Sequence, residues 1–74
     1  MPLKTDAFRA NVKSFVLWKG LLFKDVAKRA GLSPEWFSKM LAGKSNPSLP
    51  VCERIAGALE VPLEVLLSEQ VVTN

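Results

Sequence analysis

The stretch AKRAGLSPEWFSKMLAG, residues 27–43, decides the fold because it ends one helix and starts another within a few residues. Gly31 can adopt the left-handed conformation that terminates a helix. Ser33 offers its hydroxyl as an N-cap, and Pro34 suits the first helical position because its missing N–H would have no partner there. The sequence therefore predicts one helix over about 23–30 and another that begins at Pro34.

Two short helices joined by such a glycine-containing turn cross at a steep angle. The small Ala27 lets the pair approach closely, and one face of the helix over 34–41 then projects from the domain. A projecting helix can enter the major groove of B-DNA, which is about 12 Å wide and presents readable base edges. The same glycine and serine also occur in helical hairpins that only pack, so this motif alone leaves both interpretations open.

Three further helices are predicted around this pair, since apolar residues recur at helical spacing and no sustained alternation indicates a strand. Gly20 and Gly43 supply stop signals, and Ser48 is a cap for the fourth helix with Pro50 tolerated in its first turn. The fold class is therefore all-α: one compact five-helix domain over residues 1–68, followed by a short C-terminal tail over 69–74. The expected inward side chains are, helix by helix, Phe8, Val12 and Phe15; Val26, Ala27 and Ala30; Phe37, Met40 and Leu41; Cys52, Ile55, Ala56 and Leu59; and Leu63, Leu66 and Leu67.

The composition excludes several classes of protein. The 74 residues are 49% hydrophobic, but no apolar run approaches the roughly 18 residues of a membrane span, and the N-terminus is too polar for a secretory signal. We therefore expect a soluble cytoplasmic protein.

Cys52 is the single cysteine and histidine is absent, so we expect no disulfide, metal site or cofactor. We expect Cys52 to be a small hydrophobic residue of the core. Because no side chains fill the nucleophile or base roles, we expect no enzyme.

The net charge of +3 hides an uneven distribution along the chain. Residues 1–45 hold nine Lys and Arg against three acids, a net +6, whereas residues 46–74 hold one basic residue against four acids, a net −3. This asymmetry is typical of a protein with one end facing a polyanion. Scattered lysines also occur as an ordinary solvated surface, so charge alone does not decide the function.

A run of landmarks at fixed spacing covers about two thirds of the chain, over residues 21–67. The landmarks are Leu21, Ala27, GLS at 31–33, Ser38, GKSNPSL at 43–49, Ala56, AL at 58–59, Val61 and LEVLL at 63–67. With them the sequence resembles, without a gap, the DNA-binding domain of the Cro and lambda-repressor family, the xenobiotic-response-element type of helix-turn-helix. The resemblance implies a compact five-helix domain that binds duplex DNA, usually as a symmetric dimer on a palindromic operator, and regulates transcription.

The resemblance also implies which residues meet DNA. The base-reading positions of the family fall at the start and along the outer side of the third helix, and its phosphate contacts fall at the start of the second helix and in the loop after the third. Phosphate contacts fix register, whereas groove contacts select sequence. The implied DNA-binding residues are Ser33, Pro34, Glu35, Ser38 and Lys39 on the third helix, Lys24, Lys44, Ser45 and Asn46 for phosphate, and Trp36 flanking them.

Each role has a structural alternative, and the chain departs from the family pattern at two positions. Ser38 can simply pack in its helix, Asn46 can form the turn before a proline, and Lys44 can be a solvated charge. Phe23 stands where relatives usually carry glutamine, and Pro34 stands where a polar base reader is common.

Glu35 is open to two interpretations. Its carboxylate could accept a hydrogen bond from cytosine N4 in the groove. It could instead favour the amino-terminal end of its own helix electrostatically.

Five large hydrophobic residues exceed what a small core can hold: Leu17, Trp18, Leu22, Phe23 and Trp36. Such a surplus often marks a partner surface, most simply a homodimer interface. Val71 and Val72 in the tail could contribute to it. The alternative is that several of these side chains fold back over the core.

Two functions follow from these observations. The leading hypothesis is a sequence-specific transcriptional regulator that binds double-stranded DNA as a homodimer. The alternative is an antitoxin or adaptor module that acts mainly through protein contacts, for example with a toxin. Phe23, Pro34 and Trp36 motivate this alternative because apolar residues suit a protein interface.

Overall fold

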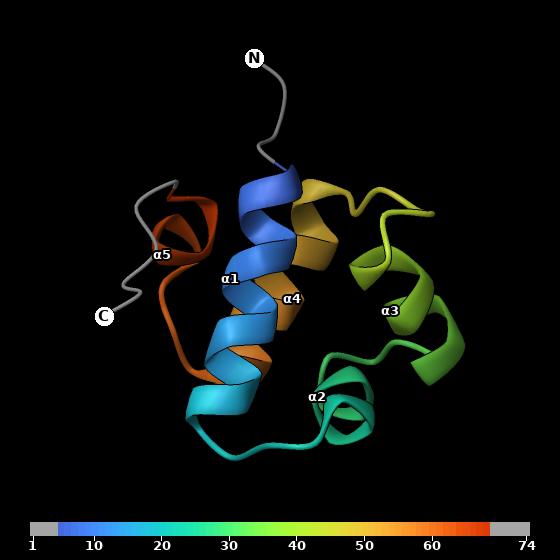
Figure 1. Cartoon of the computed structure of the whole chain (residues 1–74), viewed down its shortest axis with the longest axis horizontal. Helices are drawn as coiled ribbons and strands as arrows, with labels where there is room; N and C mark the ends of the chain where they lie inside the picture. The colour runs from blue at the N-terminus through green and yellow to red at the C-terminus, as the bar shows by residue number, and fades with distance from the viewer. Residues whose placement is uncertain (1–4, 69–74) are drawn as a thin grey trace.

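Five helices build the domain in the computed structural model, which describes residues 5–68. No strand occurs within this range. The helices are α1 Thr5–Trp18, α2 Phe23–Arg29, α3 Pro34–Leu41, α4 Leu49–Leu59 and α5 Leu63–Leu67. In Figure 1, α1 runs through the middle of the view with α5 on one side and the α2–α3 pair on the other. The predicted all-α, five-helix architecture is confirmed, whereas the predicted tail over 69–74 lies outside the described residues.

The junction between α2 and α3 is built as the sequence predicts. Gly31 has a φ of +73°, in the left-handed region. The backbone N–H of Leu32 donates to the carbonyl oxygen of Ala27 at 2.8 Å, which closes the end of α2. Ser33 Oγ then accepts from the backbone N–H of Trp36 at 3.0 Å, and Pro34 occupies the first turn of α3. The chain therefore changes direction through the local chemistry of Gly31, Ser33 and Pro34.

The core draws side chains from all five helices. Its fully buried members are Phe8, Val12, Val16, Val26, Ala27, Phe37, Met40, Cys52, Ile55, Leu59 and Leu66. Burial raises the pKa of the Cys52 thiol above its ordinary value, so the thiol stays protonated at neutral pH. The interpretation of Cys52 as a core hydrophobe is confirmed.

One prediction about α1 needs correction. Phe15 was expected on the inward stripe, but the fully buried residue in that turn is Val16, and Phe15 is only half-buried. The reason is that Phe8, Val12 and Val16 keep a constant step of four residues along the face that meets the core. Phe15 packs at the edge of the core and meets the ring of Trp18 edge to face, with 6.2 Å between ring centroids.

The surplus of hydrophobic residues divides into two groups. Phe23 and Trp36 are half-buried and pack against the core, as the alternative interpretation proposed. Leu17, Trp18 and Leu22 remain 71%, 80% and 57% exposed around the end of α1. Val71 and Val72 lie outside the described residues. Among the described helices, none is both long enough and apolar enough to cross a membrane.

Candidate nucleic-acid interface

The outer face of α3 is exposed to solvent. Glu35, Ser38 and Lys39 are exposed along it, while Phe37 and Met40 on the opposite face are buried in the core. The predicted positions at the start of the helix, Ser33 and Pro34, are exposed as well, and Trp36 at the side is half-buried. The helix is held by one face and presents the other, as the sequence predicts.

The loop from α3 to α4 brings the predicted phosphate-binding residues next to the end of α3. The backbone N–H of Lys44 donates to the carbonyl oxygen of Lys39 at 2.9 Å and closes α3. Lys44 and Asn46 are exposed and Ser45 is half-buried. Within residues 5–68, the backbone N–H groups of Ser45, Asn46 and Ser48 have no acceptor.

A surface hollow of about 320 Å³ lies between α1, α2 and α3, next to the outer face of α3. Its floor is apolar and its rim carries two ammonium groups and a hydroxyl. The lining residues are Lys13, Phe23, Lys24, Pro34, Phe37, Ser38 and Leu41. Lys24, Pro34 and Ser38, which the sequence predicts to bind DNA, line the same hollow as Lys13 of α1. The sequence did not predict a role for Lys13. The one feature of the sequence that could have indicated Lys13 is its position one helical turn after Arg9.

Four lysines surround the bare face of α3: Lys13, Lys24, Lys39 and Lys44 are all exposed. Within residues 5–68 none of these ammonium groups pairs with a carboxylate. Glu64, by contrast, belongs to α5, which lies on the far side of α1 from α3 (Figure 1). The four lysines therefore form a basic rim around α3, with Glu35 as the single acid on the helix itself.

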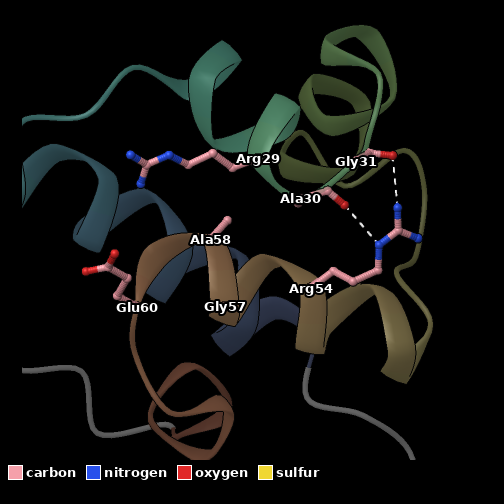
Figure 2. A pocket seen from close by; sticks show the side chains of 7 residues that line it. All are labelled: Arg29, Ala30, Gly31, Arg54, Gly57, Ala58 and Glu60. Carbon is pink, nitrogen blue, oxygen red and sulfur yellow. Dashed lines mark hydrogen bonds between the residues drawn. The ribbon is translucent and has the colours of Figure 1, made fainter.

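Arg54 ties the α2–α3 turn to α4. Its Nε donates to the carbonyl oxygen of Ala30 and its Nη2 to that of Gly31, each at 2.9 Å. Figure 2 shows this guanidinium reaching from α4 to the turn, at one side of an open hollow that has Arg29 and Glu60 at its other side. Through this contact the start of α3 is fixed by the helix behind it.

The Arg54 contact leads to a stability prediction for Gly31. A Cβ at Gly31 would lie 2.5 Å from Arg54 Nη2, whereas a Cβ at Gly43, with a φ of +86°, would meet nothing within 4 Å. Gly43→Ala therefore carries only the left-handed strain of about 1–2 kcal/mol. Gly31→Ala also displaces the guanidinium, so we expect it to lower the free energy of unfolding by about 1 kcal/mol more.

Urea denaturation of the two alanine variants measures this difference. An Arg54→Met background should abolish it, because the guanidinium is then already absent. Equal losses for both glycines in the wild-type background would show that Arg54 does not hold the turn.

Comparisons with known proteins identify the family and the fold of this chain. A family model described as a helix-turn-helix domain matches residues 7–69. The chain belongs to the helix-turn-helix domain family. A search of curated proteins finds no match to this helix-turn-helix chain.

Two solved structures of the clp gene regulator ClgR from Corynebacterium glutamicum are similar to this helix-turn-helix domain. One has 26% sequence identity and a TM-score of 0.81, and the match covers 93% of this chain and 90% of that chain. The other has 26% identity and a TM-score of 0.82, and it covers 92% and 72% of the two chains. Family and fold together support DNA-binding transcription regulation.

Proposed function

We propose that this chain is a sequence-specific transcriptional regulator of the Cro and lambda-repressor type, which inserts α3 into the major groove of duplex DNA. The observation that carries the proposal is the exposed outer face of α3. Glu35, Ser38 and Lys39 are exposed on it, while the inner face of the helix is buried in the core. A helix held in this way can reach base edges while its contacts with the core stay intact.

The side chains divide between base edges and phosphates according to their chemistry. Lys39 donates to guanine O6 and N7, Glu35 accepts from cytosine N4, and Ser38 can do either. Ser33 and Pro34 lie at the end of the helix that enters the groove, with Trp36 beside them. Phosphates are held by donors that flank α3 on both sides, which are Lys24 from α2 and Lys44, Ser45 and Asn46 from the loop.

We further propose that the regulator acts as a homodimer on a palindromic operator. Leu17, Trp18 and Leu22 support this proposal because these large apolar side chains, at the end of α1 and just before α2, remain 71%, 80% and 57% exposed. A two-fold dimer would place two copies of α3 about one helical turn apart on the DNA.

Selection of bound sequences from a pool of random duplexes tests the function. We expect enrichment of a palindrome with half-sites about 10 base pairs apart, and an affinity that falls steeply as salt rises. Enrichment of single half-sites would reject the dimer but keep the DNA function. Absence of any binding at low salt would reject the DNA function and favour a module that binds protein through Phe23 and Pro34.

A further inference from the structure

Arg9 is the one basic side chain that the described fold buries. It lies on α1 and is 9% exposed. Its Nε donates to the carbonyl oxygen of Met40 at 2.6 Å, and its Nη1 donates to Asp6 Oδ1 at 3.0 Å. Its Nη2 donates to the carbonyl oxygen of Ser45 at 3.0 Å and to Asn46 Oδ1 at 2.8 Å. Four hydrogen bonds therefore converge on one planar group.

Three of the four acceptors of Arg9 belong to α3 and to the loop that follows it. The Met40 carbonyl lies in the last turn of α3 and also accepts from the backbone N–H of Gly43 at 3.1 Å. Two more acceptors belong to Ser45 and Asn46 in the following loop, and the fourth, Asp6, lies on α1 itself. Because the guanidinium is a rigid fork, it fixes the distance between the end of α3 and this loop.

The contact also fixes which way the Asn46 amide points. A guanidinium has only donors, so the atom that faces Arg9 must be the oxygen of the Asn46 amide. The Nδ2 group, which can donate to a phosphate, is then at the other end of the amide and has no acceptor within residues 5–68. A loop without Arg9 could turn this amide either way.

The charge of Arg9 is compensated in part by the end of α3. The carbonyl end of a helix carries partial negative charge, and Met40 supplies a carbonyl from that end. Asp6 adds a carboxylate, but its side chain is fully exposed, so water screens this ion pair. The backbone and Asn46 acceptors therefore hold the guanidinium in place more than Asp6 does.

We propose that Arg9 is a positioning residue for DNA binding, which sets the loop carrying Lys44, Ser45 and Asn46 relative to the outer face of α3. Phosphate contacts from the loop and groove contacts from α3 can then form at the same time. This inference rests on the proposed DNA function. It assigns to α1, which does not enter the groove, control over the contacts made by two other elements.

Asn11 offers a matched control on the same helix. It is 1% exposed, and its Nδ2 donates to the carbonyl oxygens of Val65, Leu66 and Ser68 at 3.2, 2.7 and 2.8 Å. These acceptors belong to the end of α5, on the other side of α1 from α3 (Figure 1). Replacing Asn11 therefore removes a comparable buried polar contact without touching the DNA-facing surface.

The experiment compares Arg9→Met, Arg9→Lys and Asn11→Ala with the wild type, at a temperature where circular dichroism shows each variant folded. Binding to the wild-type-selected duplex is measured by fluorescence anisotropy at several salt concentrations. We expect Arg9→Met to weaken binding about 10–100-fold and to flatten the salt dependence, because one or two loop phosphate contacts are lost. The affinity of Arg9→Lys should lie between those of the wild type and Arg9→Met. The affinity of Asn11→Ala should stay within about 2-fold of wild type.

A second readout needs no DNA. In Arg9→Met or Arg9→Lys, the backbone N–H of Lys44, which bonds to Lys39, should exchange faster with solvent, while that of Leu32 at the α2–α3 turn should not change. If Arg9→Met does not fold, Arg9→Lys carries both measurements.

Three results would decide against the inference. Wild-type affinity in folded Arg9 variants would overturn it and leave the proposed function intact. An equal loss of affinity in Asn11→Ala would overturn it as well, because the effect would then follow stability alone. Failure of the wild type to bind any duplex would overturn both proposals.

Discussion

Replacing Phe37 with alanine will lower the melting temperature of the domain by at least about 12 °C. Phe37 is 1% exposed and joins α3 to the core, and a Phe→Ala change at such a site costs about 3–5 kcal/mol. A chain of this size has a total stability of only about 4–11 kcal/mol. The cavity would lie under the helix that carries the candidate DNA-reading residues, so DNA binding should weaken together with the stability of the fold.

Thermal denaturation followed by circular dichroism measures this effect, and two variants serve as controls. Phe37→Leu keeps most of the apolar volume and should cost less than half as much. Trp18→Ala removes an even larger side chain, but one that is 80% exposed, so the free energy of unfolding should change by no more than about 0.5 kcal/mol. A melting temperature for Phe37→Ala within a few degrees of wild type would contradict the packing of α3 described above.

Neutralising Lys39 and Lys44 together will weaken duplex binding about 50-fold at roughly 0.1 M salt, with little change in stability. Both ammonium groups are exposed beside the bare face of α3 and have no carboxylate partner within residues 5–68. Loss of the Lys44 phosphate contact should also lower the slope of log affinity against log salt by about 1. Fluorescence anisotropy over a salt series gives both quantities for Lys39→Gln/Lys44→Gln.

The matched control is Lys28→Gln/Arg29→Gln, which removes the same charge from the end of α2. Both side chains line a hollow with Leu21 and Asp25, on a part of α2 that carries none of the candidate DNA contacts. Its salt slope should stay at the wild-type value. Equal losses in the two double variants would mean that net charge, and not the lysines beside α3, controls binding.

The helix ends could be predicted from sequence because they depend on local chemistry. Gly31, Ser33 and Pro34 each act within four residues of their own position, and the structure places them as expected. The buried face of α3 follows from spacing in the same way. The bare face could be predicted as well, because its polar residues are those that the apolar stripe leaves out.

The contacts of Arg9 and Asn11 could not be predicted in this way. Arg9 meets Asn46, which lies 37 residues away, and Asn11 meets Leu66, which lies 55 residues away. Prediction from the spacing of apolar residues places charged and polar residues of α1 on the surface. It therefore predicts that both side chains are exposed. The competition between Phe15 and Val16 for the core was missed for a similar reason, because it depends on the path of α1 past other helices.

Amide chemical-shift mapping with a selected duplex shows most directly whether the outer face of α3 meets DNA. We expect the largest shifts at residues 33–39 and 44–46, with little change along α5. Shifts that cluster at the end of α1 around Trp18, with the α3 amides unmoved, would show that α3 is not the helix that meets DNA.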